Sequence, residues 1–155
     1  MSKRWVRVGV LALVIFVVNG LSRFITWQAD IVKDTEQLRL GLVALAFVTL
    51  IIAVATAWWA VRYPFGRIFA DVGAAVGIGG LLSVLVGPFL GGATPFAGGL
   101  GFFVGQVLMF AGLAAVGGFL GYVTVVALGK DWKSRGLKRY EELHSGKRTH
   151  KTVRR

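Results

Sequence analysis

Four long apolar runs constrain this chain of 155 residues more than any other feature. They cover residues 5–27, 40–61, 72–92 and 102–129. Runs of roughly 18 or more apolar residues are typical of helices that cross a lipid bilayer. Hydrophobic residues make up 55% of the chain and charged residues 16%, which leaves too little polar surface for a separate soluble domain. The sequence therefore predicts an all-α integral membrane protein, with a four-helix transmembrane domain in residues 1–129.

The charged residues are distributed unevenly among the polar segments between these runs. The N-terminal segment has three basic residues, the segment between the second and third runs has two against one acidic residue, and the tail has ten against three. These three alternate segments account for the whole net charge of +11. Short segments rich in Lys and Arg stay on the cytoplasmic side of a membrane. The pattern predicts that both termini are cytoplasmic, in what we expect to be a bacterial plasma membrane.

Tryptophans mark the ends of the same runs. Trp5, Trp58, Trp59 and Trp132 fall at the predicted cytoplasmic ends, and Trp27 falls at the outer end of the first run. Tryptophan favours the membrane interface because its ring is apolar while its N–H still needs a partner. The aromatic residues therefore predict the same topology as the charges.

Small residues recur at helical spacing in the last three runs. Lipid gives apolar side chains no reason to leave it, so membrane helices associate where small residues let their backbones approach. We expect the glycine-rich second half to form a tight hairpin against the second helix, and the first helix to be peripheral. The alternative use of these glycines is a flexible gate or a homodimer seam. The predicted packing residues are Ala46, Thr49, Ala53, Thr56, Ala60, Gly73, Gly77, Gly80, Gly87, Gly101, Gly105 and Gly112, and Gly117 and Gly121 continue the series.

Two amide side chains fall inside the predicted spans. Asn19 and Gln106 both lie toward the outer face, on the first and fourth helices. They either line a polar site or bond each other across the bundle, and we expect the bond because it needs no ligand. No Asp, Glu, Lys or His occupies the centre of a span, which argues against an ion-coupled or proton-coupled transporter.

The residues that catalysis or metal binding requires are missing from suitable positions. The chain has no cysteine, and both histidines, His144 and His150, belong to the basic tail. Neither histidine has carboxylates or other ligands at the spacing of a metal or acid–base site. We therefore predict no enzymatic activity, no cofactor and no metal.

Residues 130–155 form the predicted cytoplasmic tail. Its first part, to Leu143, places apolar side chains on one helical face, which indicates a short amphipathic helix at the membrane surface. The part from His144 onward is expected to be disordered when alone. Anionic lipids are the expected partner, because each basic residue near such a leaflet contributes about 1 kcal/mol. An acidic protein partner is the alternative, and nucleic acid is not expected. The predicted contact residues are Lys130, Trp132, Lys133, Arg135, Lys138 and Arg139.

Two functions stay open on the sequence alone. The first is a non-enzymatic accessory or structural subunit of a larger membrane complex. The second is a small permease, channel or holin-like pore made from several copies of the chain. The lack of ionisable groups inside the spans, the packing residues and the basic tail favour the first function.

Overall fold

The computed structural model describes residues 3–29 and 34–148. This part of the chain contains helices and no strands. Four of its helices are long and apolar enough to cross a membrane, which confirms the predicted all-helical class with four candidate spans. The helices are α1 (Lys3–Gln28), α2 (Asp34–Ala60), α3 (Phe65–Leu85), the single turn α4 (Gly87–Leu90), α5 (Gly99–Ala127) and α6 (Trp132–Arg148).

Proline and glycine determine where the helices of the second half begin and end. Pro64 is the N-cap of α3, where its φ of −67° suits a helix start and its missing N–H is not needed. Pro88 cannot donate to a carbonyl one turn earlier, and α3 ends just before it, at Leu85. Gly129 adopts a positive φ of 60° after α5. The N–H groups of Gly129 and Lys130 then bond back to the last carbonyls of α5, which is a Schellman motif.

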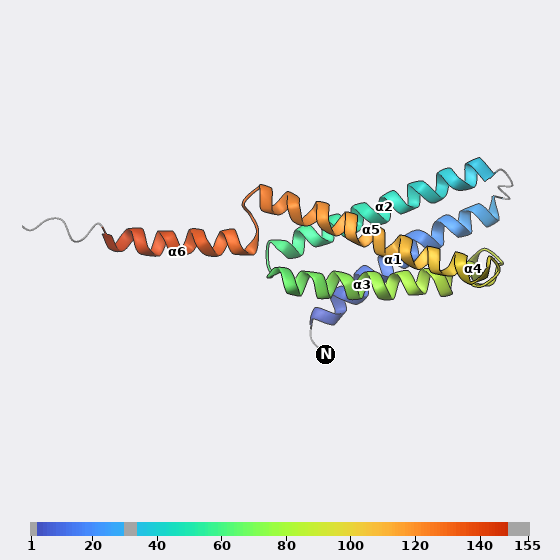
Figure 1. Ribbon diagram of the computed structural model, residues 1–155, viewed down its shortest axis with the longest axis horizontal. Helices are drawn as coiled ribbons and strands as arrows, with labels where there is room; N and C mark the ends of the chain where they lie inside the picture. Colours follow the sequence, from blue (N-terminus) through green and yellow to red (C-terminus); the bar gives the residue numbers. More distant parts are fainter. Residues whose placement is uncertain (1–2, 30–33, 149–155) are drawn as a thin grey trace, which may run out of the picture.

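The four long helices run along the long axis of the molecule (Figure 1). The start of α1, the turn at residues 61–64 and the segment 128–131 lie at one end, which we call the basic end. The end of α1, the start of α2 and α4 lie at the opposite end. Alternate connections therefore share an end, as four consecutive crossings require.

The helices pair differently from the arrangement that the sequence suggests. α2 lies against α5, and α1 lies against α3, whereas α3 and α5 contact each other less extensively. The expected packing of the second helix against the second half agrees with the contact of α2 with α5, but the expectation of a tight hairpin between α3 and α5 is wrong. The expectation that the first helix is peripheral is also wrong, because Val8, Ala12 and Ile15 of α1 are almost fully buried.

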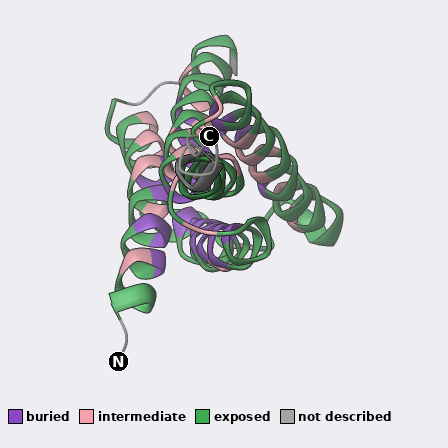
Figure 2. Ribbon diagram, turned by 90° about the vertical axis from the view of Figure 1, so that its left-hand side faces the viewer, coloured by how far each residue is buried: buried purple, intermediate pink, exposed green. Residues whose placement is uncertain are grey.

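The buried residues lie where the four helices meet, and the outward faces are exposed (Figure 2). Those outward faces are apolar, with exposed side chains such as Leu13, Phe47, Phe69 and Phe119. Apolar patches of this extent are unusual on a soluble monomer and suit a lipid environment. The core itself is built mainly from Val, Ile and Ala.

Helix α6 projects from the bundle along its long axis (Figure 1). This differs from the predicted amphipathic helix lying across the membrane surface. The helix also continues to Arg148, so the expectation of disorder from His144 onward is wrong for its first residues. The rest of that prediction, with His150, falls in residues 149–155, which lie outside the described part of the chain.

Candidate functional site

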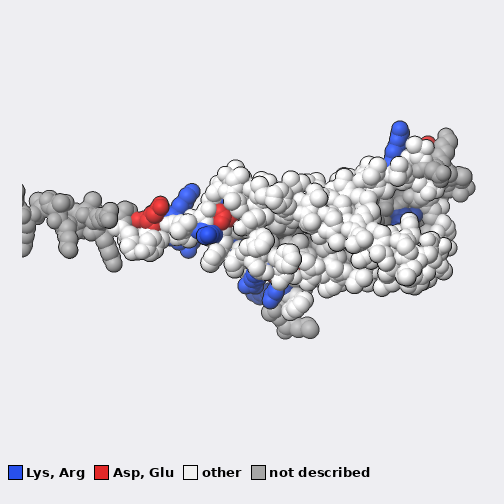
Figure 3. Space-filling view, in the orientation of Figure 1, with Lys and Arg blue, Asp and Glu red and all other residues white. Residues whose placement is uncertain are grey.

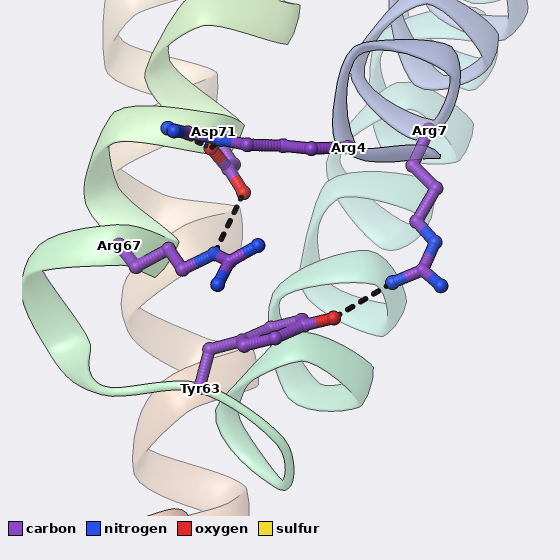
Figure 4. A network of polar contacts seen from close by, with 5 residues as sticks. All are labelled: Arg4, Arg7, Tyr63, Arg67 and Asp71. Atoms are coloured by element: carbon purple, nitrogen blue, oxygen red, sulfur yellow. Dashed lines mark hydrogen bonds and ion pairs between the residues drawn. The ribbon is translucent and has the colours of Figure 1, made fainter. Parts of the chain in front are cut away.

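A network of charged and aromatic side chains joins three segments at the basic end (Figure 4). Asp71 of α3 is almost completely buried and pairs with Arg4 of α1, with 2.6 Å between Nη2 and Oδ1. Its second oxygen, Oδ2, lies 3.8 Å from Nε of Arg67 on the preceding turn of the same helix. Arg7 donates to the Tyr63 hydroxyl at 2.8 Å. The network therefore connects α1, α3 and the turn between α2 and α3.

Aromatic rings hold the guanidinium groups of the same region. Arg67 lies over the Tyr63 ring at 4.1 Å from its centroid, and Arg62 lies over Trp58 at 4.2 Å. Such cation–π contacts stabilise by about 0.5–1 kcal/mol each at exposed sites. Arginine is not deprotonated in proteins, and both oxygens of Asp71 face arginines. The network suits the fastening of helix ends better than acid–base chemistry.

Charge is confined to the ends of the molecule on the face that Figure 3 shows. Lys and Arg side chains lie at the basic end and at the opposite end, and the surface between them carries no charged group on that face. An uncharged surface between charged ends is typical of a protein that spans a bilayer. In the described part of the chain, no three His, Cys, Asp or Glu side chains lie together as metal ligands would.

The two amides do not form the expected bond. Asn19 is buried, and its Nδ2 has no hydrogen-bond partner among the described residues. Gln106 of α5 is half-buried. The predicted tie between the first and fourth helices is therefore absent in the described part of the molecule. The backbone carbonyl of Asn19 instead accepts a hydrogen bond from the Ser22 hydroxyl at 2.8 Å.

Some of the predicted packing residues form close helix contacts. A Cβ added at Gly117 of α5 would lie 2.7 Å from the backbone oxygen of Thr49 on α2. Gly121, one turn further on, meets the backbone of Ala53 in the same way. Thr56 and Ala60 are buried on α2, and Ala46 is exposed.

The predicted glycines divide into two groups. Gly80 lies against Phe110, with 3.3 Å from its added Cβ to the ring, and Gly87 lies against the Arg23 side chain. Around the others, an added Cβ would meet none of the described atoms within 4 Å. These glycines are Gly73, Gly77, Gly101, Gly105 and Gly112.

An apolar groove lies between α3 and α5. Its volume is about 640 Å³, and small residues line much of it, including Gly73, Gly77, Ala115 and Gly118. Thr56 of α2 also lines it. The Thr56 hydroxyl is buried and has no hydrogen-bond partner among the described residues. The sequence did not indicate this groove, because it results from the limited contact between two helices that were expected to pack tightly.

The residues predicted to contact lipid or a partner lie on and beside α6. Lys130, Trp132, Lys133, Arg135, Lys138 and Arg139 are all exposed. Asp131 precedes the helix and caps it, because its Oδ2 accepts from the backbone N–H groups of Lys133 and Ser134 at 3.2 and 3.3 Å. The Ser134 hydroxyl and these N–H groups hold the pKa of the Asp131 carboxyl below its usual value of 3.8.

Comparison of the chain with protein-family models, with curated proteins and with solved structures gave no match.

Proposed function

We propose that this chain is a non-enzymatic accessory or structural subunit of a larger membrane complex in a bacterial plasma membrane. Residues 1–129 are its membrane domain, both termini are cytoplasmic, and residues 130–155 form a cytoplasmic tail. The observation that carries this proposal is the position of α6, which projects from the bundle at the basic end (Figure 1).

Helix α6 exposes apolar side chains that the bundle does not cover. Trp132, Leu137, Tyr140 and Leu143 are 53–70% exposed, and basic residues lie between them. Isolated helices of this length are marginally stable in water, so tertiary contacts usually provide most of their stability. A protein partner that covers the apolar side chains would supply such contacts, and its acidic residues would pair with Lys133, Arg135, Lys138 and Arg139.

The network at the basic end supports a structural role. The carboxylate of Asp71 and the hydroxyl of Tyr63 are both engaged with arginines, whereas a general acid or base has to be within reach of a substrate. The network instead fixes the start of α1 and the start of α3, at the same end of the molecule as the segment from which α6 projects (Figures 1 and 4).

The test is photo-cross-linking from α6 of the full-length chain in its native membrane. A photoreactive residue replaces Tyr140 in one variant and Lys138 in the control, which lies on another face of the same helix. The proposal predicts one discrete heteromeric adduct from position 140 and a weaker one from position 138. It also predicts a mild-detergent complex whose mass is not a multiple of 16.7 kDa.

Two results would contradict the proposal. A monomer in mild detergent, with no adduct from either position, would show that the chain belongs to no larger complex. A homogeneous ring whose mass is a multiple of the single chain, together with ion leak in liposomes that Gln106→Leu abolishes, would favour the pore instead.

A further inference from the structure

We propose that the groove between α3 and α5 binds one acyl chain of an anionic glycerophospholipid, with the headgroup at the basic end. This inference does not depend on the proposed accessory role, because a lipid can occupy the groove of a free or an assembled subunit.

The size of the groove fits a hydrocarbon chain. It extends along α3 from Phe65 to Leu81, which is roughly 24 Å at 1.5 Å per residue. Dividing 640 Å³ by that length gives a mean cross-section of roughly 27 Å², which corresponds to a width of roughly 5 Å. Non-bonded carbon atoms meet at about 4 Å, so a single extended acyl chain fits this width. An α-helix is about 10 Å wide with its side chains and would have to lie over the groove instead of within it.

The lining of the groove has the chemistry that an acyl chain requires. Its walls are apolar side chains and glycines, and only Thr56 and Tyr122 bring hydroxyl groups. Gly73 and Gly77 of α3 leave open space where a side chain would otherwise fill the groove. The volume also lies within the range of about 300–1,000 Å³ that ligand sites occupy.

Thr56 supplies a hydrogen-bond donor at the depth of a lipid ester. It lies four residues before the end of α2 at Ala60, or roughly 6 Å inside the basic end. Its hydroxyl is buried without a partner among the described residues, and a buried unpaired hydroxyl is unfavourable. Rotation about χ1 exchanges the hydroxyl and methyl groups, so Oγ1 can donate to an ester carbonyl in the groove.

The charge at the basic end of the molecule complements an anionic headgroup. Six basic side chains precede α6 at the basic end, where the described residues include two carboxylates, Asp71 and Asp131. Asp71 is already engaged by two arginines, and Asp131 caps α6. The basic residues are Lys3, Arg4, Arg7, Arg62, Arg67 and Lys130.

The test uses the full-length protein in phosphatidylcholine bilayers that contain a trace of phosphatidylglycerol with a nitroxide on its acyl chain. Electron paramagnetic resonance then measures the motionally restricted lipid. Gly77→Leu fills the groove, while Gly112→Leu adds the same side chain at another open position outside it. We expect wild type and Gly112→Leu to retain about one restricted lipid per protein more than Gly77→Leu. Labelled phosphatidylcholine should bind at least about fivefold more weakly than phosphatidylglycerol.

Thr56→Val tests the hydroxyl without changing the shape of the side chain. We expect it to weaken phosphatidylglycerol binding about two- to tenfold, the range of one hydrogen bond. Equal restricted lipid in wild type and Gly77→Leu would overturn the proposal, provided that near-ultraviolet circular dichroism shows both proteins folded. A single cysteine that replaces Ala115, inside the groove, tests whether a second copy of the chain occupies the groove instead of a lipid. Its quantitative oxidation to a dimer in the same bilayers would show that a second copy of the chain covers the groove.

Discussion

Replacement of Gly79 by alanine tests the unexpected contact between α1 and α3. The added Cβ would lie 2.7 Å from the backbone oxygen of Ala12 and 3.2 Å from Cβ of Ile15. A backbone atom cannot rotate away, so one helix must shift. Overpacking of this kind lowers the free energy of unfolding by about 1–3 kcal/mol, and the better helix propensity of alanine offsets up to about 1 kcal/mol of this loss. We expect Gly79→Ala to lower the free energy of unfolding by about 1–2 kcal/mol.

Gly77→Ala is the matched control on the same helix. Apart from the neighbouring backbone of its own helix, no described atom lies within 4 Å of its added Cβ, so we expect unchanged stability or a gain of up to about 1 kcal/mol. The assay is unfolding of the full-length protein by sodium dodecyl sulfate in mixed micelles, followed by tryptophan fluorescence. Equal midpoints for the two variants would refute the reasoning, because α1 would then not approach α3 closely at this point.

Three further predictions concern the ion pair at Asp71, the start of α6 and the topology. Asp71→Asn should destabilise the bundle by about 1–2 kcal/mol in the same assay. This is less than the loss of a fully buried ion pair would cost, because Arg4 is 40% exposed. In a double-mutant cycle, Arg4→Gln should add little to the destabilisation by Asp71→Asn. Asp131→Ala should weaken the start of α6 by about 1 kcal/mol, seen as faster hydrogen exchange in its first turn. Since the folded pKa of Asp131 is depressed, wild-type protection should persist above pH 3.8 and fall as pH drops through the lower folded value. A membrane-impermeant maleimide should label Thr94→Cys from outside intact cells but Ser134→Cys only after permeabilisation, and the opposite pattern would invert the proposed topology.

The existence of the four long helices followed from the four apolar runs alone. An apolar run that must cross lipid has few alternatives to a helix, so length and hydropathy are sufficient. The helix ends were less predictable, because hydropathy detects the part inside the hydrocarbon and not the polar turns beyond it. α2 begins at Asp34 and α3 at Phe65, six and seven residues before the predicted spans, since polar and aromatic residues extend a helix as well as apolar ones do.

The choice of helix partners was beyond the sequence, because small residues occupy several faces of the same helix. The spacing of Gly73, Gly77 and Gly80 suggested one packing face on α3. The structure places Ala75, Gly79 and Ser83 in the core, at a regular spacing of four residues, and of the three predicted glycines it buries Gly80 alone. That series was visible in the sequence, but nothing in a single helix shows which of two small-residue faces its neighbours cover.

The two faces of α3 have different consequences for the whole molecule. Gly79 brings α3 against the backbone of α1, so that face is used within the chain. Gly73 and Gly77 lie on the wall of the groove, where no described side chain fills the space. In lipid, open space beside a glycine must be filled by something, because close contacts and not the hydrophobic effect hold the bundle together. The glycines that the chain does not use for its own packing therefore indicate where this protein meets molecules outside it.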